Sequence, residues 1–242
     1  MTASLPIKVA TWNLEWAEVK QKRSPHIENL VDSSTPDVCC FTEVTTGFIP
    51  HDGHVITSGP DYGYPNPKGL RRKVILSSSQ PWKGVSTHDT SSMPPGRFIA
   101  GVSHGIRFIR VCIPWHDAHV STGRKDAKRW DEHRRYLRAL EQILNDYSTR
   151  SEPICLLGDY NQRSPKGWQP QDVFELLHQT LRSLEFHTAD IQDSEGNYFI
   201  DHITTSSSLK YNIEGHYPKK LNRIKLSDHS GHYGTLSHQS PP

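Results

Sequence analysis

The sequence predicts one domain of mixed α/β architecture, in which β-strands and helices follow one another along the chain. The 242 residues contain no internal repeat and no dividing linker, so we expect a single domain over 1–242 with a frayed tail at 238–242. Short apolar or alternating runs, which indicate strands, are interrupted by long helical patterns. With 34% hydrophobic residues and a net charge of +2, the composition is typical of a globular protein and does not argue for a polyanionic partner.

The predicted strands are short runs that alternate apolar and polar residues or are apolar throughout. The run 153–157 is the most apolar and is closed by Gly158. His104-Gly105 separates two alternating runs and predicts a hairpin. The predicted strands lie at 5–11, 37–42, 55–56, 73–78, 97–103, 106–113, 153–157, 198–203, 209–214 and in a last run that ends near residue 236.

Three helices are predicted. Ser24-Pro25 is typical of a helix start and opens a short helix through about Val31. The longest helical pattern covers 124–147, where one apolar stripe and many charged residues predict an amphipathic helix packed on a sheet. A further helix is expected at 172–184. The stripe of the long helix consists of Trp130, His133, Leu137, Leu140, Leu144 and Tyr147.

The cysteines and the apolar runs predict a cytoplasmic protein. All four cysteines lie in strand-like apolar runs, which indicates buried thiols in a reducing compartment rather than disulfides. The first residues lack a basic segment followed by an apolar one, so no secretory signal is expected. No apolar run approaches the length of a membrane span. The cysteines are Cys39, Cys40, Cys112 and Cys155.

Polar side chains collect at the ends of the predicted strands. Asp159 and Asn161 follow the run 153–157, and although such a pair alone is an ordinary turn, other strand ends supply partners. Asn13 and Glu15 follow the first strand and would share a face in an extended chain. The other strand-end candidates are Glu43, Asp201, Asp228, His229 and, on weaker grounds, His116.

A sheet architecture that holds these strand ends together would form one polar pocket. That pocket would contain five carboxylates with few cations, so a bound cation would relieve their repulsion. Glu43, at the end of an apolar run, needs a lysine, an arginine or a metal as partner if it is buried. Oxygen-rich ligands favour Mg²⁺, with Mn²⁺ as a substitute, over Zn²⁺. A hard cation beside histidine and asparagine suits in-line attack on a phosphate.

Five motifs within residues 12–229 resemble those of the endonuclease/exonuclease/phosphatase superfamily, which includes deoxyribonuclease I and the exonuclease III type of enzyme. Each motif is weak alone, whereas five in the family's order are highly specific. The resemblance implies a four-layer α/β sandwich, with two mixed β-sheets face to face and helices outside. It also implies a metal-dependent hydrolase acting on phosphoester bonds. The motifs are Trp12-Asn13-Leu14-Glu15, Phe41-Thr42-Glu43, Gly158-Asp159-Tyr160-Asn161, Ile200-Asp201-His202 and Ser227-Asp228-His229.

The resemblance implies a metal site, with Mg²⁺ as the expected ion. Glu43 matches the family's principal metal-binding glutamate. Asn13, Glu15 and Asp228 match residues around that ion, and a second ion is an open alternative.

The resemblance also implies catalytic roles. Asp159 matches the aspartate that orients or deprotonates the attacking water, and Asn161 its neighbouring phosphate-contacting amide. His229 matches the histidine that binds the scissile phosphate, with Asp201 as its orienting partner. His116 resembles a second phosphate-contacting histidine by position rather than by motif.

Nucleic acid is the first candidate substrate, because it is the commonest phosphodiester of the cytosol. Candidate phosphate contacts are Arg71 with its neighbours Arg72 and Lys73, and also Arg163 and Lys166. Ordinary solvated loop cations would give the same pattern. The motifs leave open DNA or RNA, and cleavage within a strand or at its end.

Three alternatives remain. A phosphodiesterase or phosphatase for a small-molecule or lipid phosphoester is the main one, although 198–202 replaces the Trp-Cys-Asp-Arg signature of inositol phosphatases. Ser230-Gly231-His232 stands where abasic-site enzymes carry Cys-Pro or a similar pair, which argues against abasic-site specificity. A non-catalytic binding module is disfavoured because the motif carboxylates and histidine are present. Zinc binding by the His-x-x-His pairs that begin at His51, His116 and His229 lacks supporting cysteine pairs.

Overall fold

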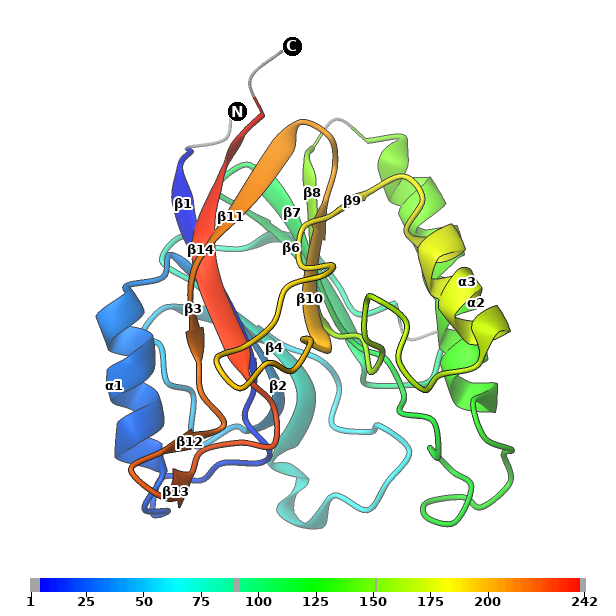
Figure 1. Cartoon of the computed structure of the whole chain (residues 1–242), viewed down its shortest axis with the longest axis horizontal. Helices are drawn as coiled ribbons and strands as arrows, with labels where there is room; N and C mark the ends of the chain where they lie inside the picture. Colours follow the sequence, from blue (N-terminus) through cyan, green and yellow to red (C-terminus); the bar gives the residue numbers. More distant parts are fainter. Residues whose placement is uncertain (1–4, 89–91, 151, 240–242) are drawn as a thin grey trace.

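Two six-stranded β-sheets pack face to face in the computed structural model, which describes residues 5–88, 92–150 and 152–239 (Figure 1). The first sheet has the order β11 (Leu209–Tyr217), β14 (Gly231–His238), β1 (Ile7–Asn13), β2 (Val38–Thr45), β4 (Arg71–Ser78), β3 (His54–Thr57). The second has the order β5 (Lys83–Ser86), β6 (Phe98–Ser103), β7 (Ile106–Cys112), β8 (Ile154–Asp159), β10 (Asp201–Thr205), β9 (Glu185–Phe186). A separate ribbon pairs β12 (Lys220–Leu221) with β13 (Ile224–Lys225).

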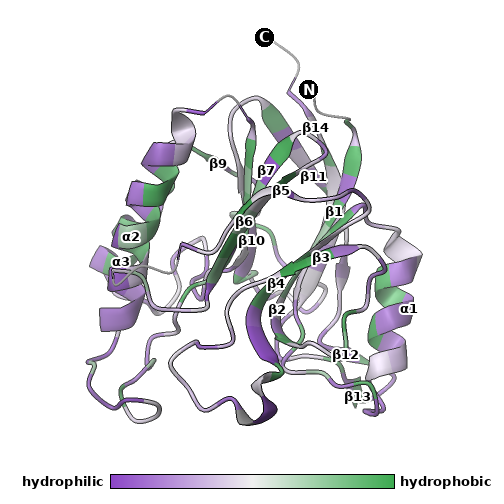
Figure 2. Cartoon of the chain, turned by 180° about the vertical axis from the view of Figure 1, so that it is seen from behind, coloured by the Kyte–Doolittle hydropathy of each residue, from purple (hydrophilic) through white to green (hydrophobic). Residues whose placement is uncertain are grey.

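Helices cover the outer face of each sheet, so the chain folds as the four-layer α/β sandwich that the resemblance implies. Helix α1 (Ser24–Ser34) lies against the first sheet, and α2 (Asp131–Ser148) and α3 (Gln171–Thr180) lie against the second. Figure 2 shows the hydrophobic side of each helix turned toward its sheet and the hydrophilic side turned outward. A short 3₁₀ helix covers Pro67–Gly69. Among the described residues, no helix is long and apolar enough to cross a membrane.

Apolar residues fill three layers, which explains why central strands are apolar on both faces. In β2, Val38 and Cys40 lie in the core between the two sheets, whereas Cys39 and Phe41 pack with α1. The four cysteines are buried free thiols, as predicted. The two sheets therefore bury both faces of their central strands and leave the strand ends available for polar residues.

Helix α2 begins at Asp131 rather than at Arg124, which corrects the predicted start. The Asp131 carboxylate accepts the backbone N–H of Lys128 at 3.0 Å and closes a turn there, and Trp130 has a left-handed backbone (φ 70°). The rest of the predicted stripe is buried, so the amphipathic pattern is confirmed from His133 onward.

Several strand ends differ from the predicted ones, and β11, for example, ends at Tyr217 rather than at residue 214. The strand expected from residue 198 begins at Asp201, because Asp201–Thr205 pairs with β8. His238, which was expected in a frayed tail, pairs with Leu209 in the first sheet. Residues 240–242 of that predicted tail lie outside the described residues.

Candidate active site

The topology brings polar strand ends to one edge of the sandwich. β1 and β2 are parallel, so Asn13 and Glu43 lie near the same edge of the first sheet. β8 ends with Asp159, and the antiparallel β10 begins opposite it with Asp201. β14 runs antiparallel to β1 and therefore starts at this edge, directly after His229. This edge therefore holds the ends of β1, β2 and β8 and the starts of the antiparallel strands β10 and β14.

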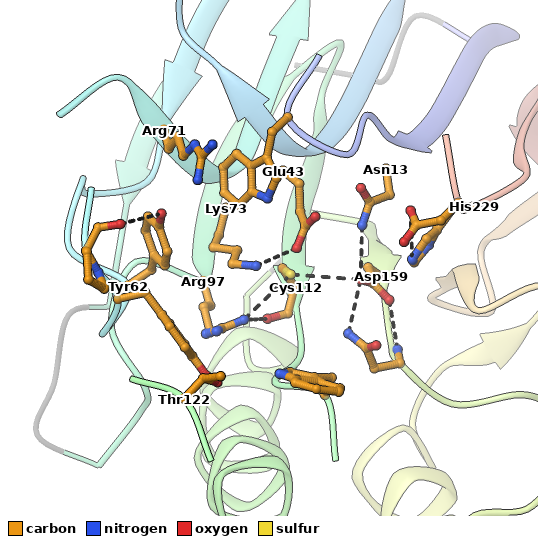
Figure 3. A pocket seen from close by; sticks show the side chains of 16 residues that line it. Asn13, Glu43, Tyr62, Arg71, Lys73, Arg97, Cys112, Thr122, Asp159 and His229 are labelled. Atoms are coloured by element: carbon orange, nitrogen blue, oxygen red, sulfur yellow. Dashed lines mark hydrogen bonds and ion pairs between the residues drawn. The ribbon is translucent and has the colours of Figure 1, made fainter. Parts of the chain in front are cut away.

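These strand ends line a cavity of about 450 Å³ (Figure 3). Aromatic side chains and three cations form much of the remaining wall. The predicted site residues that line the cavity are Asn13, Glu43, Arg71, Asp159, Asn161, Asp228 and His229.

Asp159 is buried, at 2% exposure, and is held by three hydrogen bonds from amide groups. Its Oδ1 accepts the backbone N–H of Asn161 at 2.9 Å, and its Oδ2 accepts the side-chain amide of Asn161 at 3.0 Å. The amide of Asn13 donates to the same Oδ2 at 3.4 Å, which joins the two sheets at the cavity. The Asn161 amide also donates to the Ile113 carbonyl at 2.8 Å, so its orientation is fixed as well. The carboxylate therefore has a single well-defined position.

His229 and Asp201 form a buried pair beside Asp159. The Nδ1 atom of His229 lies 2.6 Å from Oδ2 of Asp201. Behind this pair, the fully buried Arg110 lies with Nη2 3.9 Å from Oδ1 of Asp201 and donates from Nη1 to the Thr11 hydroxyl at 2.5 Å. An ionised carboxylate between an imidazolium and a guanidinium is stable in a buried position because both partners compensate its lost hydration.

The pKa values of the buried groups follow from these contacts. Burial raises the pKa of Asp159 and His229 opposes this, but Asp201 and Glu43 add to it, so the pKa reaches about 7. Burial lowers the pKa of His229, yet Asp159 and Asp201 outweigh that effect and raise it to about 10. Burial likewise disfavours ionised Asp201, but His229 and Arg110 hold its pKa below the usual value. Near neutral pH the site therefore contains a cationic histidine and an aspartate that is close to its titration point.

Glu43 has the cationic partner that its apolar surroundings predicted. Nζ of Lys73 lies 2.5 Å from Oε1 of Glu43. Burial raises the pKa of Glu43, but Lys73 outweighs burial and lowers it. The side chain of Asp228 is 55% exposed, with its Oδ1 3.9 Å from Nε2 of His229. Glu43 thus lies within the cavity wall and Asp228 at its more open side.

Glu15 does not line the cavity. β1 ends at Asn13, and Glu15 has a left-handed backbone (φ 46°), so the two side chains do not share the face expected of an extended chain. Instead the carboxylate pairs with Lys225 and lies 3.3 Å from Nη1 of Arg23. These two cations hold Glu15 on the outside of the site, which corrects its predicted position among the metal ligands.

His116 also lies outside the cavity lining. Its neighbour Trp115 lines the cavity instead, and Nε2 of His116 lies 2.9 Å from Asp117. Burial lowers the pKa of His116 despite this carboxylate. Arg163 and Lys166 are exposed on the loop after β8 and do not line the cavity either. The structure therefore brings Arg71, but not these three residues, to the cavity.

Arginines that the sequence analysis did not single out change the predicted charge balance. Arg97, at 3% exposure, lines the cavity and donates to the Cys112 carbonyl at 3.4 Å. With Lys73 and Arg110 also present and Glu15 turned away, the expected surplus of carboxylates is wrong. Arg110 was detectable, because strand alternation places it on the same face as Phe108, which lies between the sheets. The same alternation relates Arg97, at the start of the predicted strand 97–103, to Ile99, which also lies between the sheets.

The residues of the cavity fit a hard divalent cation. The carboxylates of Glu43, Asp159 and Asp228 and the amide of Asn13 supply oxygen donors of the kind that Mg²⁺ binds. Ligand atoms of Asp159, Asp201 and His229 also lie within 4.8 Å of one another. In that second group the histidine and Asp201 already contact each other at 2.6 Å, so these two side chains have a partner without a metal ion.

In each His-x-x-His pair at least one ring contacts other partners, which argues against zinc binding by these pairs. His51 contacts the Ser77 hydroxyl at 2.7 Å and the Pro36 carbonyl at 3.0 Å. His119 accepts the backbone N–H of Arg124 at 3.1 Å, and the ring of His232 contacts the Tyr211 hydroxyl at 3.1 Å.

Comparisons with known proteins agree with this architecture. A structure of the 3′-5′ exonuclease NExo from Neisseria meningitidis has a TM-score of 0.65 and 20% identity, over 94% of this chain and 98% of that one. Another structure of NExo, described as a 3′ phosphatase bound to product DNA hairpin, has the same values. An AP endonuclease from Archaeoglobus fulgidus has a TM-score of 0.61 and 16% identity, over 94% and 98% of the two chains. No curated protein sequence matches the chain significantly.

A sequence model of the endonuclease/exonuclease/phosphatase family matches residues 10–229. This range contains every cavity-lining residue described above. The chain therefore belongs to the endonuclease/exonuclease/phosphatase family.

Proposed function

We propose that the chain is a Mg²⁺-dependent phosphodiesterase whose substrate is nucleic acid, with DNA as the first choice. The observation that carries this proposal is the convergence of Asp159, the His229–Asp201 pair and Glu43 on one cavity of about 450 Å³. Members of the family are phosphoesterases, and the structural neighbours described above include DNA-processing enzymes. The unusual pKa values of Asp159 and His229 are those expected of an acid–base site.

Glu43, Asp228 and Asn13 would hold the metal ion, which supplies positive charge to the phosphate and to the leaving oxygen. Glu43 also forms an ion pair with Lys73, and it thereby holds the Lys73 ammonium group at the same cavity. Arg71 also lines the cavity, and its guanidinium lies 5.0 Å from the centre of the Trp16 ring. A guanidinium at this place would bind an adjacent phosphate of the substrate.

Asp159 would orient the attacking water and accept its proton. The three amide donors around this carboxylate fix its direction, and a pKa of about 7 makes it an effective base near neutral pH. Asn161 holds Asp159 and would contact the phosphate. His229, kept cationic by Asp201, would bind a phosphate oxygen and stabilise the charge that develops during attack.

The alternative substrate is a small-molecule or lipid phosphoester. The volume of the cavity supports this alternative, because it lies in the range that encloses a single small ligand, about 300–1,000 Å³. The cavity rings Tyr62 and Tyr64 would contact an apolar or aromatic group attached to such a phosphate.

The test compares the parent with Asp159→Asn in Mg²⁺ and in EDTA. Substrates are supercoiled plasmid, single-stranded DNA, RNA and bis-p-nitrophenyl phosphate. Asp37→Asn is the matched control, because Asp37 is a half-buried carboxylate that accepts the Lys8 N–H at 2.8 Å before β2, at the strand end away from Glu43.

Metal-dependent cleavage of a polynucleotide that Asp159→Asn loses and Asp37→Asn keeps would support the nuclease. Cleavage of the small diester alone would favour the alternative substrate class. Equal rates for the parent and Asp159→Asn would remove Asp159 from the mechanism.

A further inference from the structure

Two tryptophans are exposed beside the candidate active site. Trp115 is 42% exposed and Trp168 is 59% exposed. His116 lies between them, with its ring centre 5.0 Å from that of Trp115 and 4.5 Å from that of Trp168. We call Trp115, His116 and Trp168 the tryptophan platform. Exposed rings of this size are unfavourable in water, so a contiguous group of them indicates a binding surface.

The platform is fixed in place from below and from the side. The buried Trp130 packs beneath it, with its ring centre 5.3 Å from that of Trp168. The guanidinium of Arg129 lies 5.9 Å from the centre of the Trp168 ring. Asp117 binds both Arg129, at 2.9 Å, and His116, at 2.9 Å. The rings are therefore preorganised, which lowers the entropy lost when a ligand stacks on them.

The platform is continuous with the catalytic cavity. Trp115 lines that cavity together with Asp159 and His229, whereas Trp168 lies beyond His116 on the outer side. A ligand whose phosphate reaches Asp159 therefore passes Trp115 first and Trp168 further out.

The charge around the outer ring matches an anionic ligand. The segment 163–168 that carries Trp168 contains Arg163 and Lys166 and no acidic residue. Both cations are exposed, and neither forms an ion pair with any described residue. Flat aromatic surfaces interleaved with free cations are the features by which proteins bind single-stranded nucleic acid without reading its sequence.

We propose that the tryptophan platform binds unpaired nucleotides of a DNA strand that leads into the cavity, so that the enzyme selects single-stranded DNA or a single-stranded end. A base within a duplex is covered on both faces by its neighbours and offers no face to Trp168. An unpaired base offers both faces and leaves its phosphate free to contact Arg163 or Lys166. The proposal rests on the proposed function and adds to it the strand state of the substrate.

The test measures binding in EDTA, which prevents cleavage, with fluorescein-labelled oligothymidylate and with a DNA hairpin that is paired throughout. Trp168→Ala is expected to raise the Kd for oligothymidylate by about 5- to 150-fold, the loss typical of one stacked base, and to change hairpin binding little. Trp168→Phe should recover most of the affinity. Val85→Ala is the matched control, because Val85 is an exposed apolar residue, 48% exposed, on β5.

A second readout is the tryptophan fluorescence of the protein. Oligothymidylate should quench it in the parent, and quench it less in Trp168→Ala. Equal losses of oligothymidylate and hairpin binding, or no loss in Trp168→Ala, would overturn the proposal. A concentration-dependent dimer that Trp168→Ala abolishes would also overturn it, because a second copy of the chain would then cover the platform.

Failure of this proposal is distinguishable from failure of the proposed function. If the parent cleaves duplex DNA in Mg²⁺ but does not bind oligothymidylate, the phosphodiesterase assignment stands and the platform proposal is wrong. If oligothymidylate binds in a Trp168-dependent way but no polynucleotide is cleaved, the platform proposal stands and the catalytic assignment is wrong.

Discussion

The Nδ1 atom of His229 lies 2.6 Å from Oδ2 of Asp201, although Asp201 is fully buried and belongs to the other sheet. His229 enters β14 of the first sheet and Asp201 begins β10 of the second, so this contact connects the two halves of the sandwich at the cavity. The contact leaves Nε2 as the ring nitrogen that the proposed function assigns to a phosphate.

Asp201→Asn should lower kcat by about 10²- to 10⁴-fold, the usual contribution of a positioned acid or base. The amide keeps the volume of the carboxylate but does not stabilise a cationic His229. The measurement is steady-state cleavage of bis-p-nitrophenyl phosphate in Mg²⁺, with Asp37→Asn as control. A kcat within twofold of the parent would show that the pair is not needed.

The pH dependence of cleavage should be bell-shaped. Asp159 acts as the base only when ionised, so kcat falls as the pH drops below its pKa of about 7. His229 acts only when protonated, so kcat falls again as the pH rises past about 10. Because a bound cation favours the ionised carboxylate, more Mg²⁺ should move the acidic limb to lower pH. If the pKa of the acidic limb does not change with the Mg²⁺ concentration, a group other than Asp159 causes that limb.

Glu43→Gln should raise the Mg²⁺ concentration for half-maximal activity by at least about tenfold, since even indirect partners of a metal contribute that much. Glu15→Gln is the matched variant, because Glu15 pairs with Lys225 and Arg23 outside the cavity. It should leave the Mg²⁺ dependence unchanged. The measurement is an Mg²⁺ titration of the cleavage rate. If Glu15→Gln raised the half-maximal Mg²⁺ concentration more than Glu43→Gln, then Glu15 rather than Glu43 would be the metal ligand.

Acid should destabilise the fold between about pH 6.5 and pH 4. Burial lowers the pKa of His133, His202 and His232 to about 4, so below 6.5 the unfolded chain binds protons that the folded chain does not. Each histidine then removes up to about 1.4 kcal/mol of unfolding free energy per pH unit. Asp159 has the opposite effect on stability, because its pKa is raised and the folded chain therefore binds a proton that the unfolded chain does not. Its contribution offsets that of one of the three histidines.

Urea unfolding across this pH range measures the effect. His133→Gln should reduce the slope of unfolding free energy against pH by the contribution of one histidine. Glutamine is the suitable replacement because it can still donate to the Pro114 carbonyl that His133 contacts at 2.7 Å. A free energy of unfolding that stays constant over this range would mean that these histidines are protonated in the folded chain.

Gly158→Ala should prevent stable folding or cost more than about 3 kcal/mol. Gly158 has φ 145°, which only glycine adopts readily, and a Cβ there would lie 2.0 Å from the Val111 carbonyl oxygen on the neighbouring strand β7. Gly47→Ala is the control, because a Cβ at Gly47 meets nothing within 4 Å. Thermal unfolding of both variants gives the comparison, and equal Tm values would show that the strands shift apart at low cost.

Local patterns predicted most elements because burial imposes them directly. The alternation of β1 and the apolar run of β8 both follow from packing between layers. The predicted start of α2 was wrong because a turn held by Asp131 precedes the helix, which therefore begins seven residues later than predicted. The hydrophobic period alone does not contain that interaction.

Local spacing places the candidate residues at strand ends, because Asp159, Asn161, Glu43, Asp228 and His229 follow or interrupt apolar runs. Which polar residues share the cavity depends instead on contacts between distant parts of the chain. Glu15 turns away because its backbone is left-handed and Lys225, distant in sequence, pairs with it. Arg97, Lys73 and Arg110 reach the site because strands far apart in the chain pair there. A side chain's direction beyond a strand end depends on such long-range partners, which no local pattern encodes.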